Sequence, residues 1–224
     1  MISDVDKESE HELRSYGRRR GRKPSARQAA LLREVLPRFA INPTVLPDAA
    51  QTWLEIGFGG GEHLLAQARH NPQALVIGCE PYEDGVIKVL SAIESEGLKN
   101  IRVHMGDVRD VLRQFAPGSL DRAFILFPDP WPKRKHRKRR LVNSLLLDLL
   151  ARALKPKAEL RIATDIGDYA RTILEAFRME PRFVWQVESP DDWRAQPADW
   201  VETKYESKAQ EAGRRRYYFR FLRA

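Results

Sequence analysis

Short apolar runs alternate with longer amphipathic segments from residue 51 to residue 178. The apolar runs have the length of strands and lie at Thr52–Ile56, Ala74–Cys79, Ile101–Met105, Arg122–Phe127 and Glu159–Ala163. The helix-length segments lie at Glu62–His70, Asp84–Glu96, Val108–Phe115, Lys138–Leu154 and Gly167–Arg178. Strands that alternate with helices predict βαβ units, which build a parallel sheet with helices on both faces.

The end of the chain has a different pattern. A strand-like run at Phe183–Glu188 is followed by a loop rich in proline and tryptophan, and then by an aromatic final strand at Arg216–Leu222. We therefore expect an α/β fold with a mostly parallel central sheet and an antiparallel C-terminal strand.

The N-terminal residues lack this regular pattern. Residues 1–12 are acidic and polar, and residues 13–27 are rich in arginine with two glycines and little apolar content. Residues 28–40 have helical spacing up to Pro37, where proline should end the helix. We expect a flexible basic arm over residues 1–27 and a single domain over residues 28–224.

The charge balance indicates a polyanionic partner. Lysine and arginine number 39 against 31 aspartates and glutamates, which gives a net charge of +8 and a pI near 9.7. Such an excess concerns the binding partner rather than the fold. A basic, soluble protein with no polyanionic partner would share this composition, so the distribution of the charge along the chain decides between the two interpretations.

Several classes of protein are disfavoured. Cys79 is the single cysteine, so the chain can form no internal disulfide or cysteine zinc site, and we expect no metal. Residues 1–12 have no apolar core like that of a signal peptide. The most apolar helical stretch, residues 141–154, is too short to cross a bilayer. We expect a cytoplasmic protein with no membrane partner, whereas the pattern leaves monomer and homodimer open.

A glycine-rich turn follows the first strand directly, at Gly57-Phe58-Gly59-Gly60-Gly61. Glycines here let the backbone turn sharply and approach a ligand at the carboxyl end of a strand, although a purely structural turn would also use them. A dinucleotide fold requires a third glycine where this chain has Glu62. A carboxylate at the start of the helix disfavours a phosphate and tolerates a cationic ligand.

Three carboxylates lie at three successive strand ends. Glu55 lies next to the glycine turn and suits an ammonium group, Glu80 suits ribose hydroxyls, and Asp107 suits an adenine amino group. S-adenosylmethionine has a sulfonium, an ammonium and a nucleoside but no phosphate. The three acids together therefore predict an S-adenosylmethionine site, with Gly57, Gly59 and Gly61 approaching the cofactor.

A proline-stiffened loop, Phe127-Pro128-Asp129-Pro130-Trp131-Pro132, ends the fourth predicted strand. It places Asp129 where the methyl group of the cofactor should lie, unless the loop is only a rigid connection. A dense basic run, residues 133–140, follows at once. Its position beside the predicted reaction site favours nucleic-acid binding over a merely solvated surface.

With these motifs the chain resembles the bacterial tRNA (guanine-N7-)-methyltransferase family. The matching segments are RSYGRRRGRK (14–23), LEIGFGGGEHL (54–64), the strand end at Glu80, FPDPWPKRKHRKRR (127–140), ATD (163–165) and TKYE (203–206). The resemblance implies a Rossmann-like class I S-adenosylmethionine-dependent methyltransferase and a tRNA substrate, with the variable-loop guanine at position 46 as the target.

The resemblance also implies roles for individual residues. Glu55, Glu80, Asp107 and Asp129 would line the cofactor site. Substrate contacts would come from Lys133, Asp165, Thr203, Lys204, Tyr205 and Glu206. RNA contacts would come from Lys135, His136, Arg137, Lys138, Arg139 and Arg140.

The expected chemistry needs no general base, because guanine N7 has an exposed lone pair. This suits a chain whose histidines have no clear partner in the sequence. Catalysis then rests on positioning and electrostatics, and Asp129 is the candidate that stabilises the cationic product. Asp165 and Glu206 are the candidates that accept from the N–H groups on the Watson–Crick edge of guanine. Trp193 and Trp200 either stack on a base or, as we favour, pack the loop before Thr203.

Three other interpretations stay open. An NAD-dependent oxidoreductase is disfavoured by Glu62 and by the lack of a catalytic pair. A non-catalytic RNA-binding protein is disfavoured by the complete acidic site. A methyltransferase acting on rRNA or protein is disfavoured only by the family resemblance.

Overall fold

The computed structural model describes residues 19, 21, 23–197 and 200–224. The flexible arm predicted over residues 1–27 lies mostly outside these residues, so its mobility stays a prediction. At its described end, the carbonyl of Arg19 accepts a hydrogen bond from the backbone N–H of Glu83 at 3.0 Å. A helix begins at Ala26, where Ser25 caps it, so the boundary expected after residue 27 lies inside this helix.

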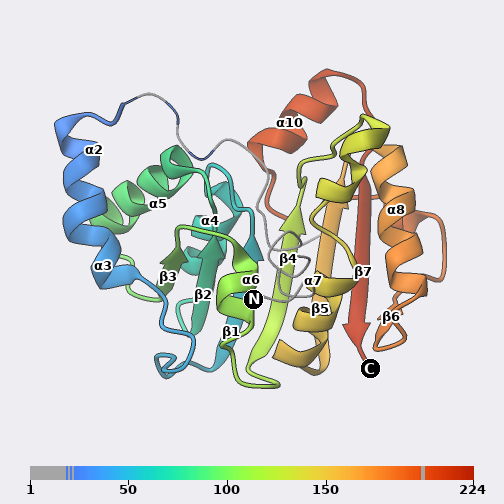
Figure 1. Cartoon of the computed structure of the whole chain (residues 1–224), viewed down its shortest axis with the longest axis horizontal. Coiled ribbons are helices and arrows are strands. Elements are labelled where there is room, and N and C mark those ends of the chain that lie inside the picture. The colour runs from blue at the N-terminus through green and yellow to red at the C-terminus, as the bar shows by residue number, and fades with distance from the viewer. Residues whose placement is uncertain (1–18, 20, 22, 198–199) are drawn as a thin grey trace, which may run out of the picture.

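Seven strands form one sheet in the order β3-β2-β1-β4-β5-β7-β6 (Figure 1). The strands are β1 (Gln51–Ile56), β2 (Ala74–Cys79), β3 (Ile101–His104), β4 (Leu120–Leu126), β5 (Leu154–Thr164), β6 (Phe183–Trp185) and β7 (Tyr217–Arg223). Strands β1 to β5 pair in parallel, whereas β7 runs antiparallel to both β5 and β6. The predicted mostly parallel sheet with an antiparallel C-terminal strand is confirmed.

Helices cover both faces of the sheet, because buried apolar residues alternate along its strands. In β1, Leu54 and Ile56 belong to one core cluster and Trp53 belongs to the other. The first cluster is closed by α6 (Val108–Leu112), α7 (Ser144–Ala153) and α8 (Gly167–Arg178). The second is closed by α4 (Glu62–His70), α5 (Glu83–Glu96) and the N-terminal helix.

The expectation that Pro37 ends the N-terminal helix is wrong. Helical structure continues through α2 (Ala26–Ala30), the π-helical turn η1 (Leu31–Val35) and α3 (Leu36–Phe39). In this turn the backbone N–H of Leu36 donates to the carbonyl of Leu31. A π-helical turn directly before a proline lets the helix continue past a residue that has no N–H to donate.

The helix expected at Lys138–Leu154 begins only at Ser144, because the side chain of Asn143 caps it by accepting from the N–H of Leu146 at 3.0 Å. The basic residues before it form a separate 3-10 helix, η2 (Arg134–Arg139).

The loop expected before the last strand contains two helices, α9 (Asp191–Arg194) and α10 (Lys204–Glu211). Helix α10 buries only Glu206 and Ala209. So small a buried face gives no apolar periodicity in the sequence.

Candidate active site

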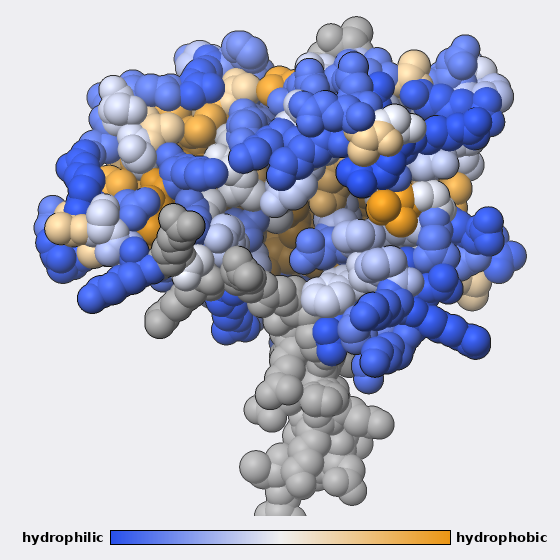
Figure 2. Space-filling view, turned by 90° about the horizontal axis from the view of Figure 1, so that it is seen from above, coloured by the Kyte–Doolittle hydropathy of each residue, from blue (hydrophilic) through white to orange (hydrophobic). Residues whose placement is uncertain are grey.

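Most of the predicted site residues lie at or just after the carboxyl ends of β1 to β5, which meet along one edge of the sheet. Helix α10 lies at this same edge, above the arrowhead of β4 (Figure 1). Figure 2 looks down on the edge, where hydrophilic side chains surround a hollow with apolar residues at its floor. Open α/β sheets bind their ligands in such a position.

The glycine turn needs its glycines for conformation and for space. Gly57, Gly59 and Gly61 have φ values of 74°, 54° and 85°, a region that favours glycine. A Cβ atom on Gly61 would lie 2.3 Å from Cγ2 of Val89, so the turn packs directly on α5. A Cβ atom on Gly57 would meet none of the described residues within 4 Å, so space is open in front of this backbone in that part of the chain. A ligand therefore has access to the turn at Gly57.

Glu80 is buried at the end of β2 and holds the turn in place. Its carboxylate accepts from the backbone N–H of Gly59 at 2.8 Å and from that of Tyr82 at 2.9 Å. Burial raises the pKa of Glu80, and the nearby carboxylates of Asp129 and Glu55 raise it further, although the two hydrogen bonds lower it. Asp129 and Glu55 therefore lie close enough to Glu80 to repel its charge, an arrangement that a cationic ligand relieves.

Glu55 has a partner that the sequence did not reveal. Oε2 of Glu55 lies 2.7 Å from Nδ1 of His63, and the two side chains are 3% and 2% exposed. Nε2 of His63 lies 3.1 Å from Nε2 of Gln67. The expectation that the histidines have no clear partner is thus wrong for His63. The only signal was its place in the first turn of the helix that follows Glu55, which faces back toward the strand end.

Asp107 caps α6 and is held by its neighbour Arg109. Its Oδ1 accepts from the backbone N–H of Arg109 at 2.9 Å and from Nε at 2.8 Å, and its Oδ2 accepts from Nη2 at 2.6 Å. A carboxylate has about four acceptor positions, so one position on Oδ2 is left for a further donor such as an amino group.

Asp129 lies on a strained loop. Phe127 and Trp131, on either side of it, have φ values of 50° and 43°, which are unfavourable for residues with a side chain. The backbone N–H of Phe127 still donates to the carbonyl of Ala163 at 2.8 Å, so the loop leaves the sheet in a defined direction. Partial desolvation raises the pKa of Asp129.

The loop is fastened to the basic helix η2. The Trp131 ring packs edge-on against His136, with centroids 5.9 Å apart, and the guanidinium of Arg139 lies 5.0 Å from the same ring. Nε of Arg140 donates to the carbonyl of Pro130 at 2.9 Å. The loop and the basic run therefore form one unit.

The basic run does not behave uniformly. Arg140 is 3% exposed, and its guanidinium binds Asp168 and lies 4.8 Å from the Tyr169 ring. This predicted RNA contact is thus an internal anchor in the structure. The solvent-facing residues of the run are Lys133, Arg134, Lys135, Arg137 and Lys138, while His136 and Arg139 are half-buried.

The Thr-Lys-Tyr-Glu segment begins α10 and lies over the glycine turn. Buried Thr203 caps the helix by accepting from the N–H of Glu206 at 3.2 Å. A Cβ atom on Gly59 would lie 3.0 Å from Cε2 of Tyr205, so these residues touch. Burial and the nearby Glu80 and Asp129 carboxylates raise the pKa of Tyr205. The structure thus brings Tyr205 to the acidic cluster, while Lys204 points to solvent.

The last two predicted substrate contacts have internal partners. Glu206 is fully buried and accepts from Nε1 of Trp200 and from the hydroxyl of Tyr218. Oδ2 of Asp165, which is half-buried, lies 2.6 Å from Nε of Arg214. Trp200 thus packs against the Thr203–Glu206 segment, as favoured from the sequence, whereas Arg214 was not considered there, because only the fold brings it to Asp165.

The donor set fits a cationic nucleoside better than a metal or a phosphate. A turn with open space at Gly57 leads to the carboxylates of Glu55, Glu80 and Asp129, which match onium and hydroxyl groups. Among the described residues, no group of three or more His, Cys, Asp or Glu side chains is placed to hold a metal ion. None of the helices in residues 23–197 and 200–224 has the length and apolar character of a membrane span.

Comparisons with known proteins agree with this site. A family model described as "Putative methyltransferase" matches residues 49–219. A tRNA (guanine-N(7)-)-methyltransferase of Hyphomonas neptunium is 47% identical over 204 residues, which covers 88% of this chain and 93% of that protein. The protein of the same name from Rhodospirillum rubrum is 44% identical over 225 residues, covering 95% and 88%.

Solved structures share the fold at low identity. The 16S rRNA methyltransferase KamB aligns with a TM-score of 0.55 and 15% identity over 79% of this chain and 89% of that one. A Streptococcus mutans methyltransferase, SMU.1697c, in complex with SAH aligns with a TM-score of 0.52 and 12% identity over 90% and 100%. The fold is therefore that of a methyltransferase.

The buried pair of Glu55 and His63 leads to a prediction about stability. We expect His63→Leu to lower the free energy of unfolding by about 3 kcal/mol, because it leaves a buried carboxylate without its partner. Urea unfolding followed by circular dichroism measures the change. A variant with both Glu55→Leu and His63→Leu should lose less than the sum of the two single variants, and additive losses would contradict the pairing.

Proposed function

The chain belongs to the tRNA (guanine-N(7)-)-methyltransferase family and methylates guanine N7 in tRNA with S-adenosylmethionine as the donor, and we propose that the acidic crevice at the carboxyl edge of the sheet performs this transfer. The observation that carries the proposal is the cluster of Glu55, Glu80 and Asp129, in which burial and, to a lesser extent, the other two carboxylates raise the pKa of Glu80. A sulfonium donor supplies the positive charge that this cluster lacks.

The cofactor is held by the glycine turn and the acids at the strand ends. Glu55 pairs with the ammonium group through the oxygen that His63 leaves free, Glu80 accepts from the ribose, and Asp107 accepts from the adenine amino group through Oδ2. Gly57, Gly59 and Gly61 allow the backbone to approach the cofactor, since the first of them borders open space.

When bound, S-adenosylmethionine supplies a methyl group on a sulfonium, which guanine N7 takes with its own lone pair while the C–S electron pair stays on sulfur, so no proton moves. The residues of the chain therefore position the two partners and stabilise charge. Asp129, which accepts no hydrogen bond from the described residues, faces the reacting atoms and stabilises the base as it becomes cationic. Its strained loop, anchored by Arg140, fixes its direction.

Guanine is selected by its Watson–Crick edge, which has two neighbouring N–H donors. We assign this contact to Asp165, which is half-buried at the end of β5, and Arg214 releases it when the base enters. Glu206 was the second candidate for this contact. Its carboxylate already accepts from Trp200 and Tyr218 inside the protein, so in our proposal it holds the Thr203–Glu206 segment in place instead.

The tRNA is gripped by the exposed cations of the basic run together with the N-terminal arm. Lys133 lies closest to the loop of Asp129 in the chain and contacts the substrate phosphate, while Lys135, Arg137 and Lys138 contact the flanking backbone, with His136 and Arg139 supporting them. The target guanine leaves its base stack so that its N7 atom can reach the methyl group of the cofactor. The variable-loop guanine at position 46 is the proposed target, and the reaction belongs to the cytoplasm.

Asp129→Asn tests the proposal directly. We expect kcat to fall about 10²–10³-fold, because a stabiliser of transition-state charge is lost. Transfer of a tritiated methyl group from the cofactor to unmodified tRNA measures the rate, and chemical cleavage at 7-methylguanine maps the product. Asp110→Asn, an exposed acid on α6, is the matched control and should retain activity. Unchanged transfer by Asp129→Asn would contradict the role of Asp129, and wild-type product at another atom would contradict the function.

The raised pKa values predict a pH dependence of cofactor binding. The cation binds the deprotonated carboxylates, and the pKa values of Glu80 and Asp129 are raised by desolvation. Affinity for S-adenosylmethionine should therefore be full at neutral pH and fall as the pH is lowered. The fall should begin at a pH above the ordinary carboxyl pKa of about 4, because both pKa values are raised. Calorimetric titration between pH 5 and pH 8 measures this, and Glu80→Gln should flatten the curve. Affinity that rises on acidification would refute the assignment.

The proposed recognition of the Watson–Crick edge is tested with a tRNA transcript that has inosine at the target position. Inosine lacks the exocyclic amine, so one donor to Asp165 is lost. We expect kcat/KM to fall at least about tenfold for the wild type. The difference between guanine and inosine should shrink in Asp165→Asn. Equal kcat/KM on both transcripts for the wild type would exclude recognition of the Watson–Crick edge by Asp165.

A further inference from the structure

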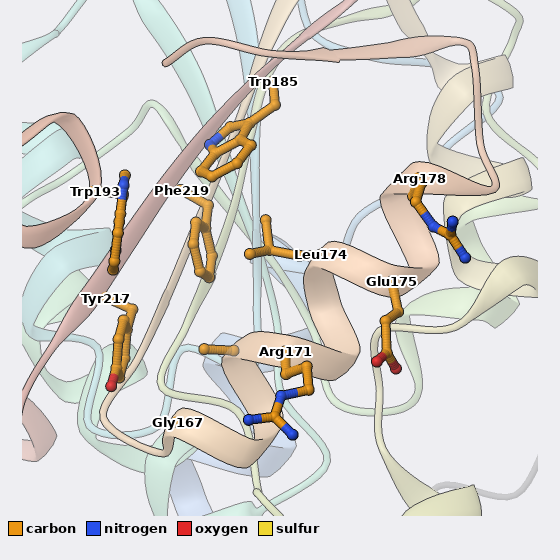
Figure 3. A pocket seen from close by; sticks show the side chains of 10 residues that line it. Gly167, Arg171, Leu174, Glu175, Arg178, Trp185, Trp193, Tyr217 and Phe219 are labelled. Carbon is orange, nitrogen blue, oxygen red and sulfur yellow. The ribbon is translucent and has the colours of Figure 1, made fainter. Parts of the chain in front are cut away.

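A second cavity lies on α8, outside the cofactor crevice. It has a volume of about 390 Å³, within the range of about 300–1,000 Å³ that is usual for small-ligand sites. Its lining includes Trp185, Trp193, Tyr217 and Phe219 from the C-terminal part of the chain, opposite Leu174 of α8 (Figure 3). None of these residues takes part in the proposed transfer.

The aromatic side of the cavity is flat. The Trp193 and Tyr217 rings are nearly parallel, at 8°, with centroids 6.0 Å apart. Figure 3 shows both rings edge-on along one side of the cavity, facing α8. A wall of this kind opposite an aliphatic side chain such as Leu174 accepts a planar ring better than an irregular side chain. The sequence favoured packing over base stacking for Trp193, and the structure places it half-buried at this wall.

The cavity also offers polar groups to such a ring. Nε1 of Trp185 is buried and has no hydrogen-bond partner among the described residues. Buried donors of this type normally have one, and in Figure 3 the ring nitrogen lies on the side turned toward Trp193. Because almost none of its surface is accessible, this donor meets an acceptor of the occupant only after the aromatic wall shifts.

The rim of the cavity on α8 has more basic than acidic side chains. Arg171 and Arg178 are exposed on α8 and line the cavity with one acid, Glu175, between them. The spacing of 171, 174 and 178 places these side chains on one face of the helix. The guanidinium of Arg194 lies 4.4 Å from the Trp193 ring. The cationic rim and the aromatic wall together match a nucleotide, whose phosphate meets the arginines while its base enters the cavity.

The cavity adjoins both surfaces assigned to tRNA. At one end, a Cβ atom on Gly167 would lie 3.2 Å from the hydroxyl of Tyr217, and Gly167 is two residues from Asp165. The next residue, Asp168, binds Arg137 of the basic helix η2 at 2.7 Å. The lining of the cavity at Gly167 therefore lies within two residues of Asp165 and beside Asp168, the partner of η2.

We propose that this cavity is a second nucleotide site, which takes an unstacked base of the bound tRNA other than the methylated guanine. The inference rests on the proposed tRNA substrate. The site would contribute to affinity and to the choice of tRNAs with a flexible nucleotide beside the target, and it would play no part in methyl transfer itself.

Trp193→Ala tests the wall of the cavity. We expect the dissociation constant for tRNA, measured by fluorescence anisotropy at fixed salt, to rise about tenfold, within the range of one base–aromatic stack. Trp193→Phe should restore most of the affinity. Val184→Ala, on the exposed side of β6, is the matched apolar control and should bind as the wild type does. The affinity for S-adenosylmethionine, measured by calorimetry, should stay unchanged in all three.

The exposed arginines provide a test that does not depend on the packing of Trp193. Arg171→Gln and Arg178→Gln should each reduce the slope of log Kd against log salt concentration by about 0.7 to 0.9, as expected for one phosphate contact. Arg33→Gln, an exposed arginine on η1, should leave the slope unchanged. Trp193→Ala should weaken binding without changing this slope.

The possible results separate this inference from the proposed function. Wild-type affinity in Trp193→Ala, together with unchanged salt slopes in the arginine variants, would overturn the nucleotide site even if N7 methylation is intact. A shift in oligomeric state of the cavity variants by sedimentation would assign the cavity to a second copy of the chain and also overturn it. A wild-type protein that transfers no methyl group to tRNA would instead refute the proposed function.

Discussion

The repulsion between carboxylates at one edge of the sheet is the constraint on which the site depends. The parallel strands end side by side, so Glu55, Glu80 and Asp129 are brought together whether or not a ligand is bound. The chain compensates with its own donors: His63 for Glu55, two backbone N–H groups for Glu80 and Arg109 for Asp107. Asp129 receives no such donor from the described residues. The compensation is therefore incomplete at the position where the cationic methyl group is expected.

Because Asp129 has no such donor among the described residues, its loop is held by several contacts with the basic run. A carboxylate that accepts no hydrogen bond is not stabilised where it lies, so other interactions of the loop must hold it in place. Trp131 lies against His136 and Arg139, and buried Arg140 donates to the carbonyl of Pro130. These contacts maintain the unfavourable φ values of Phe127 and Trp131. The basic run thus has two roles, because its inner residues fix the acidic loop and its outer residues face solvent.

Much of this could be predicted from the sequence because it depends on local order. The glycine turn and the acids at the ends of β1, β2 and β3 follow from strand positions, which apolar runs reveal. The partners of the acids could not be predicted, since His63, Arg214 and Trp200 reach them only through the fold. Arg140 could not be distinguished from the other cations of its run, because burial depends on α8 packing beside it. Helix α10 was missed because its buried face consists of only two residues.

The movement of charge during the reaction distinguishes the roles of the acids. The donor enters with a positive sulfur, and the product base leaves with the positive charge, so the crevice keeps the same net charge while that charge moves from one partner to the other. In the proposed mechanism, Glu55 and Glu80 would face parts of the cofactor whose charge does not change, so their interactions would be equally strong before and during transfer. Such uniform binding affects KM. Asp129 lies where the charge arrives, so its interaction strengthens in the transition state and affects kcat. The acid with the fewest internal partners is therefore the one expected to contribute most to the rate.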